Sequence, residues 1–251
     1  MNKSTERAIR AHAVQEFPRE SCGLVIKSGR MTKYIPCSNA AATPEEHFRL
    51  PKEEYAAAAD QGEILSVVHS HPNVPALPTP ADLDACEEGG IPWHIVHVSK
   101  DDAGAVVAGE IHSFAPSGYE APLLDLPFVH GVHDCYSLIR RWYKRERGII
   151  LPDFERKDGW WNDGTTNLYM DNFRKAGFVE VPDGVSDLQV GDVIFMQIRS
   201  KNHPNHAAVY VDAQRQLMMH HMYGQLSSRA VYGGDWLFKT RSIVRFNALP
   251  E

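Results

Sequence analysis

Residues 64–72, Ile-Leu-Ser-Val-Val-His-Ser-His-Pro, followed by Thr-Pro-Ala-Asp at 79–82, are the stretch around which the first half of this chain is organised. Successive side chains of a strand point to opposite faces, so His69 and His71 project to the same side of a strand that begins as an apolar run. The Thr-Pro pair is typical of a helix start, where a hydroxyl caps the helix and proline takes its first position. We therefore expect a strand, a short loop and a helix that presents Asp82 toward the end of the strand.

Two imidazoles and a carboxylate are the donors of a three-ligand zinc site whose fourth position stays open for water. Such a site also needs a general base, and the best upstream candidate is Glu20, which lies where a first helix gives way to a strand. Together, Glu20, His69-x-His71-Pro72, six residues and then Thr79-x-x-Asp82 resemble the signature of the JAMM metallopeptidases. That resemblance implies Glu20 as acid/base, Zn²⁺ bound by the two histidines and Asp82, and a hydroxyl at Thr79, the family's serine position, that helps to hold an oxyanion.

The alternative for this stretch is an ordinary strand with a chance His-x-His pair, followed by a capping box. Either half of the pattern alone is common, whereas five matched positions at fixed spacings are hard to reach by accident. The spacing therefore favours a zinc site over a purely structural strand and helix.

The length and composition set the number of domains and exclude some partners. A chain of 251 residues suits two domains, and hydrophobic and aromatic contents of 43% and 10% are ordinary for packed cores. A net charge of -6 argues against a nucleic-acid or anionic-membrane binder, and the basic segment 140–147 is better explained as the solvated face of a helix. We expect no signal peptide and no membrane-spanning segment. The four cysteines show no paired spacing, so we expect reduced thiols in the cytosol.

Helices and strands interleave along the first part of the chain, as an α/β or α+β domain requires. The expected helices are 7–16, 51–60 and 82–88, and the expected strands are 23–27, 31–36, 64–72, 93–98 and 105–114. Residues 115–129 then contain three prolines and no periodicity. The sequence thus predicts a first domain at 1–114, a linker at 115–129 and a second domain at 130–251.

A second group of chemically active residues follows the linker, beginning with Gly-Val-His-Asp-Cys-Tyr-Ser-Leu-Ile at 131–139. Asp134 is a good N-cap and places Cys135 in the first turn of a helix, where the helix terminus favours the thiolate. A second helix is expected at 166–175, and strands at 190–196, 206–211 and 217–221. His206 opens one of these strands, so that a thiol on a helix start faces a histidine on a sheet, which is the papain-like way of activating sulfur.

These segments resemble the NlpC family of cysteine peptidases, which cut peptide bridges of bacterial cell walls. The matching stretches are Asp-Cys-Tyr-Ser-Leu at 134–138, Gly-Asp-Val-Ile-Phe at 191–195 and His-Ala-Ala-Val-Tyr-Val at 206–211. The resemblance implies Cys135 as nucleophile, His206 as base and His220 as the residue that orients His206. A one-residue shift of the strand would put His221 in that place instead. A buried core cysteine is the plainer alternative for Cys135.

A JAMM-like domain followed by an NlpC-like domain resembles the lambda-type phage tail-tip assembly proteins along nearly the whole chain. The resemblance implies an α+β fold of two domains, a JAMM-like α/β sandwich and a papain-like NlpC-type α+β domain. It also implies a virion tail-tip protein assembled in the host cytoplasm, with other tail-tip proteins as partners and peptidoglycan stem peptides as substrate. The alternatives are a structural tail-tip protein with inactive peptidase-like domains and, less well supported, a cellular enzyme that strips modifiers from proteins.

Overall fold

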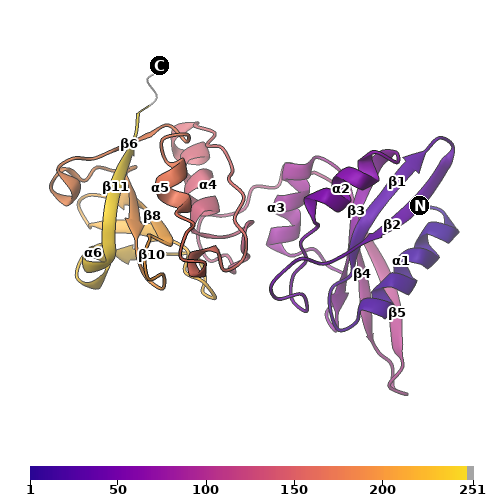
Figure 1. Cartoon of the computed structure of the whole chain (residues 1–251). Helices are drawn as coiled ribbons and strands as arrows, with labels where there is room; N and C mark the ends of the chain where they lie inside the picture. Colours follow the sequence, from indigo (N-terminus) through magenta and orange to yellow (C-terminus); the bar gives the residue numbers. More distant parts are fainter. Residues whose placement is uncertain (248–251) are drawn as a thin grey trace. The chain divides into compact units, whose positions relative to one another are not determined.

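The computed structural model describes residues 1–247 and divides the chain into two compact units, Met1–Ala121 and Pro122–Glu251. Each unit combines helices with one β-sheet, which confirms the predicted α+β class (Figure 1). Residues 115–128 belong to no helix or strand, and Val129 makes only an isolated bridge to His133. The bounds given above for the linker stay a prediction.

The first unit is a five-stranded sheet with helices on both faces. Its elements are α1 (Lys3–Glu16), β1 (Cys22–Ser28), β2 (Met31–Cys37), α2 (Lys52–Ala59), β3 (Glu63–Pro72), α3 (Pro80–Gly89), β4 (Trp93–Lys100) and β5 (Val106–Phe114). The strand order is β2-β1-β3-β4-β5, and β3 pairs with β4 in parallel while the other neighbours are antiparallel. The parallel pair needs a crossover connection, which α3 provides.

The two faces of this sheet have separate cores because strand side chains alternate. Ile9 and Ala13 of α1 pack on one face, against Val68 and its neighbours. Ala58 of α2 and Cys86 of α3 pack on the other. Both faces of β3 are therefore covered, which explains why six consecutive residues of this strand are buried. His69 and His71 point to the face that carries α2 and α3.

The second unit is built on a six-stranded antiparallel sheet. Its elements are α4 (Cys135–Arg147), the 3₁₀ turn η1 (Trp160–Asn162), α5 (Leu168–Asn172), β6 (Phe178–Glu180), the 3₁₀ turn η2 (Gly184–Asp187), β7 (Val193–Met196), β8 (His206–Asp212), β9 (Leu217–His220), β10 (Ser228–Val231), α6 (Asp235–Lys239) and β11 (Thr240–Phe246). The strand order is β10-β9-β8-β7-β11-β6. Helix α4 lies across β8 and β9.

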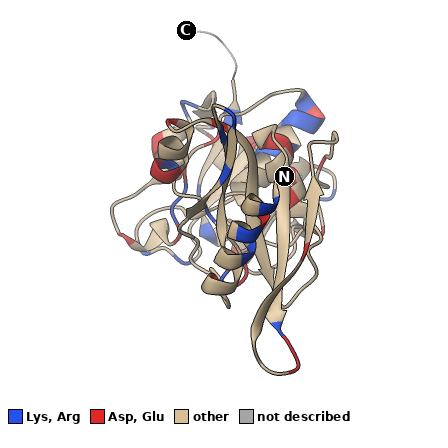
Figure 2. Ribbon diagram, turned by 90° about the vertical axis from the view of Figure 1, so that its right-hand side faces the viewer, with Lys and Arg blue, Asp and Glu red and all other residues tan. Residues whose placement is uncertain are grey.

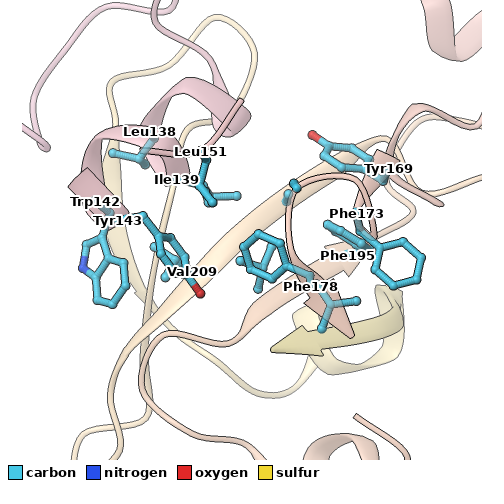
Figure 3. Close-up of a cluster of buried hydrophobic side chains, with 14 of the residues drawn as sticks. Leu138, Ile139, Trp142, Tyr143, Leu151, Tyr169, Phe173, Phe178, Phe195 and Val209 are labelled. Carbon is cyan, nitrogen blue, oxygen red and sulfur yellow. The ribbon is translucent and has the colours of Figure 1, made fainter. Parts of the chain in front are cut away.

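Local sequence sets both ends of α4. The Asp134 carboxylate accepts a hydrogen bond from the Ser137 backbone N–H at 2.8 Å, as the N-cap prediction requires. At the other end Gly148 adopts φ of 67°, a left-handed conformation that glycine reaches without strain. Between the ends, a buried stripe faces the sheet and joins side chains from α5, β6, β7 and β8 in the largest core of this unit (Figure 3).

Some elements differ from the sequence prediction. Helix α1 begins at Lys3 with Asn2 as its cap, and the helix expected at 166–175 shortens to α5, after which a tight turn leads into β6. The elements β6, β10, β11 and α6 were not predicted because each is short or lacks clear alternation of apolar and polar residues. Within the described residues no helix is both long and apolar enough to cross a bilayer. Figure 2 shows acidic and basic residues mixed along the ribbon.

Candidate active sites

Strand β3 and helix α3 bring together the three ligands predicted for zinc. The Nε2 atoms of His69 and His71 lie 3.1 Å apart, and the Asp82 carboxylate oxygens lie 3.3 Å and 3.6 Å from them. All three residues are buried, and one donor atom from each falls within 4.8 Å of the others. The geometry follows from the strand period for the histidines and from the start of α3 for Asp82.

Neighbouring groups hold each of these side chains in place. His71 uses Nδ1–H to donate to the Pro75 carbonyl at 3.0 Å, which leaves Nε2 with its lone pair. The His69 ring stacks on Phe48 at 4.4 Å and 20°. Thr79 donates to one Asp82 oxygen from its backbone N–H at 2.8 Å and from its hydroxyl at 2.7 Å, within a complete capping box. The Thr79 hydroxyl thus contacts Asp82 in this structure.

The donor set fits zinc on its own chemistry. Two imidazole nitrogens 3.1 Å apart and a carboxylate whose oxygens lie 3.3 Å and 3.6 Å from them gather around one point the nitrogen and oxygen donors that zinc binds. The hydrogen bond from His71 to Pro75 and the Thr79 capping bonds are the outer contacts that fix ligands in such sites. No other group of three or more candidate ligands occurs among residues 1–247.

Glu20 reaches the same site from the turn before β1. Its carboxyl group is buried, and burial raises its pKa to about 7, although the nearby His69 and His71 oppose this shift. Burial also acts to raise the pKa of Asp82, but the histidines and the Thr79 hydrogen bonds outweigh it and hold this pKa well below the ordinary value. One buried carboxyl group is therefore poised to exchange a proton near neutral pH while the other stays ionised.

A loop that the sequence did not single out holds Glu20 in place. The Asn39 side-chain amide donates to the backbone carbonyls of Glu20 and His47 at 3.0 Å and 2.9 Å, and the Glu20 backbone N–H donates to Pro44. The same loop brings Phe48 onto the His69 ring. No spacing rule predicts these contacts, because the loop has no periodic pattern.

Cys135, in the second unit, lies at the first residue of α4 and is half-buried. It lines one pocket with His206, and aromatic side chains form much of the wall: Phe128, Trp160, Trp161, Tyr169 and Tyr223. Among the described residues, the side chain in hydrogen-bond contact with the Cys135 sulfur is Tyr169, whose hydroxyl oxygen lies 3.0 Å away. No motif or spacing in the sequence pointed to Tyr169.

The two histidines predicted for this site meet across β8 and β9. His206 Nε2 and His220 Nδ1 lie 3.2 Å apart, and the Trp236 ring packs against His220 at 4.8 Å. His221 turns elsewhere, with its Nε2 against the Gln225 carbonyl at 3.1 Å. The register therefore places His220 beside His206, while the roles of the two residues stay predictions.

Burial sets the protonation state of this site. Burial is the main cause that raises the pKa of Cys135 to about 11, and the neighbouring Asp134 carboxylate adds to this effect. Burial is also the main cause that lowers the pKa of His206 to about 3, with smaller contributions from His220 and His221. The expected bias of the helix terminus toward thiolate is thus outweighed in the resting pocket. A neutral thiol and a neutral imidazole face the pocket at pH 7.

A buried ion pair anchors the start of α4. Arg156 Nε donates to Asp134 at 2.8 Å, and a second guanidinium nitrogen donates to the Ser137 hydroxyl at 3.1 Å. The Asp134 side chain is 2% exposed and the Arg156 side chain 7%. This pair fastens the irregular segment 148–159 to the residue that precedes the cysteine. The sequence predicted the cap but not its partner.

Comparison with known families agrees with this two-unit architecture. Residues 2–113 match the prokaryotic homologs of the JAB domain, and residues 125–245 match the NlpC/P60 family. The fold and its sites therefore define a protein in which a JAB-like domain precedes an NlpC/P60 domain.

Two phage proteins match this chain along most of their length. Tail tip assembly protein K of Escherichia phage N15 is 39% identical over 247 residues, which cover 98% of this chain and 96% of that protein. Tail tip assembly protein K of Escherichia phage lambda is 37% identical over 196 residues, 78% of this chain and 88% of that protein. The chain belongs to the family of phage tail tip assembly protein K, which confirms the resemblance seen in the sequence.

A shorter match concerns part of the chain. A probable TtuB-protein conjugate cleaving protease of Thermus thermophilus is 33% identical over 94 residues, 36% of this chain and 60% of that protein.

Proposed function

We propose that this tail tip assembly protein is a component of the virion tail tip with two hydrolytic sites. The second unit is a cysteine endopeptidase that cuts peptidoglycan stem peptides, and the first is a zinc-dependent peptidase or isopeptidase. The protein acts with other tail-tip proteins in tail assembly and in penetration of the host cell wall, after assembly in the host cytoplasm. The observation that carries the proposal is the shared pocket of Cys135 and His206, with His220 directly behind His206.

The cysteine site supports an acyl-transfer reaction. In the tautomer of His206 whose Nε2–H donates to His220, Nδ1 is the ring nitrogen that can take the thiol proton of Cys135. The sulfur then attacks the peptide carbonyl carbon, and the C–N bond breaks as the imidazolium returns its proton to the leaving nitrogen. Water hydrolyses the thioester and restores the thiol. The aromatic walls suit an extended peptide, and Arg199 in the lining suits its carboxylates.

Purified protein incubated with Gram-negative peptidoglycan tests the cysteine site. We expect soluble peptide fragments from the wild type and none from Cys135→Ala. Cys86→Ala is the matched control, because Cys86 is a buried thiol of the first unit. Equal release by wild type and Cys135→Ala, or release by neither, refutes the wall-peptidase proposal.

In the first unit, His69, His71 and Asp82 would hold the metal. Zinc bound there supplies Lewis acidity, which polarises a carbonyl group and lowers the pKa of water. Glu20 takes up and returns a proton near neutral pH, and the Phe48 ring shields one face of His69 from water. The match to a probable conjugate-cleaving protease supports a peptide or isopeptide bond as the target.

Metal analysis tests the first unit independently of any substrate. We expect about one zinc per chain in the wild type and loss of zinc in His71→Ala. His112→Ala is the control, since His112 lies on β5 outside the ligand set. A wild-type protein without zinc, or one whose zinc survives His71→Ala, refutes the metal site.

One observation favours a second candidate function, that of a structural tail-tip protein whose peptidase-like units are docking modules. The thiol of Cys135 and the imidazole of His206 both rest in their neutral forms, which is the state of an unactivated pair. Under this alternative, Cys135→Ala would leave particle assembly and infectivity unchanged and the protein would release no peptidoglycan fragments. Infectivity that falls with Cys135→Ala while particles still assemble would favour the enzyme.

A further inference from the structure

The hydroxyl of Tyr169 is the polar side-chain group in contact with the sulfur of Cys135 among the described residues. We propose that Tyr169 is a catalytic hydrogen-bond donor that stabilises the thiolate of Cys135 as the sulfur loses its proton. The proposal rests on the cysteine-peptidase function proposed above and adds a residue that neither the sequence motif nor the family match assigns.

The Tyr169 side chain is held in place by its packing. It projects from α5, and its ring centroid lies 4.9 Å from that of Phe195 on β7 (Figure 3). A second ring contact, with centroids 5.9 Å apart, joins it to Trp160. The residue is 8% exposed. A ring fixed on two sides can keep its hydroxyl at the sulfur without a large loss of side-chain entropy at each turnover.

The direction of this hydrogen bond changes with the charge on sulfur. A neutral thiol can donate to Tyr169 or accept from it, whereas a thiolate has no proton and can only accept. Burial is the main cause that raises the pKa of Tyr169 well above its ordinary value, and the nearby Cys135 adds to this effect. Tyr169 therefore keeps its proton across the pH range of the reaction and remains a donor when the thiolate forms.

The surroundings of the sulfur show why such a donor matters. Burial and the Asp134 carboxylate both oppose ionisation of Cys135, while hydrogen bonds from Tyr169 and from the Ala207 backbone N–H favour it. His206 contributes little positive charge at rest, because its own pKa lies near 3. Hydrogen bonds to an ionised group are the strong ones, so the Tyr169 hydroxyl has a large share in making the thiolate accessible.

The test is Tyr169→Phe, which removes the hydroxyl and keeps the ring. The ring matters because Tyr169 also lines an apolar cavity beside the cysteine pocket, so a smaller residue would merge the two. The matched control is Tyr232→Phe: Tyr232 is 6% exposed and its hydroxyl bonds to the Thr240 hydroxyl at 2.9 Å, away from the cysteine.

The primary readout is the rate of iodoacetamide alkylation of Cys135 against pH, measured by mass spectrometry of the peptide that contains it. We expect Tyr169→Phe to raise the pKa of Cys135 by about one to two units, so that alkylation slows roughly 10- to 100-fold at any pH below the pKa. A fluorinated tyrosine at position 169 is a stronger donor and should shift the pKa the opposite way. In the peptidoglycan assay, kcat should fall by a similar factor while KM changes less than about twofold.

Superimposable pH curves for the wild type and Tyr169→Phe would overturn the inference, as would an equal shift in Tyr232→Phe. The alkylation readout needs no substrate, so it distinguishes failure of the inference from failure of the proposed function. If Tyr169→Phe shifts the curve but the wild type cuts no peptidoglycan, Tyr169 stabilises the thiolate, and both the proposed function and the catalytic role of Tyr169 are wrong. If the wild type cuts peptidoglycan and Tyr169→Phe causes no shift, the proposed function stands and the inference about Tyr169 is wrong.

Discussion

Replacing Arg156 with methionine breaks the buried ion pair with Asp134 beside the candidate cysteine site, together with a second ion pair from Arg156 to the more exposed Asp153 at 2.8 Å. Arg156→Met keeps much of the side-chain length and removes the charge that faces Asp134, whose carboxylate is 2% exposed. Breaking a buried pair by removing one partner costs about 3–5 kcal/mol, because the remaining charge has no counterpart. Asp134 keeps hydrogen bonds from the backbone N–H groups of Gly131 and Ser137. We therefore expect the free energy of unfolding of the second unit to fall by about 3 kcal/mol, the lower end of this range.

The assay must measure the unfolding of the second unit separately from that of the first, since a chain of two units need not unfold in one step. Urea unfolding followed by hydrogen exchange and mass spectrometry of peptides from residues 122–247 does so. Arg145→Ala is the control, because the Arg145 side chain is 63% exposed and its ion-pair partner within residues 1–247 is the neighbouring Glu146 at 3.5 Å. An exposed pair of this kind contributes at most about 1 kcal/mol.

Asp134→Asn completes a double-mutant cycle, because asparagine also caps helices and leaves no buried negative charge. We expect Arg156→Met combined with Asp134→Asn to be more stable than Arg156→Met alone. The pH dependence gives a further check: burial acts to raise the pKa of Asp134, but Arg156 and the hydrogen bond from the Ser137 backbone N–H together outweigh it and hold this pKa well below its ordinary value. Stability from this group is thus lost as the pH falls below about 4, and the loss should be smaller in Arg156→Met. A cost under about 1 kcal/mol, or strictly additive effects in the cycle, would refute the reasoning.

Three further predictions concern other parts of the chain. Thr79→Ala removes the hydroxyl that donates to the Asp82 carboxylate and should lower zinc affinity about 10- to 100-fold, measured by competition with a chelator. Thr79→Ser keeps the hydroxyl and should retain the affinity; equal zinc affinities in Thr79→Ala and the wild type would contradict the role of the hydroxyl. Because the pKa of His206 falls to about 3 on folding, the second unit should lose up to about 4 kcal/mol of stability as the pH falls from 6.5 to 3, measured by urea unfolding. If the stability of a His206→Asn variant depended on pH in the same way as that of the wild type, His206 would be excluded as the cause. Gly148→Ala should destabilise the second unit by about 1 kcal/mol in urea unfolding, because φ at Gly148 is positive. A steric clash is excluded as the cause, since no atom lies within 4 Å of the added Cβ. Gly233→Ala is the control: its added Cβ also meets open space but φ is not positive, so the stability should not change.

The strand that carries His69 and His71, and the helix start that carries Asp82, could be predicted because their signals are local. Strand alternation decides which side chains share a face, and the capping pattern decides where a helix begins. The same holds for Asp134, which caps α4 as expected. Short elements such as β10 and α6 lack such signals, and the sheet that they complete recruits them by pairing and packing.

The sequence by itself determined the two groups of chemically active residues and their order along the chain, since residue type and spacing are properties of the chain alone. Only the tertiary structure decided which distant segments contact those residues: the Asn39 loop at Glu20, Arg156 at Asp134 and Tyr169 at Cys135. It also decided the ionisation of the cysteine site, where burial outweighs the helix terminus. The physical reason is that desolvation and contact depend on how loops close and cores pack, which no local spacing encodes.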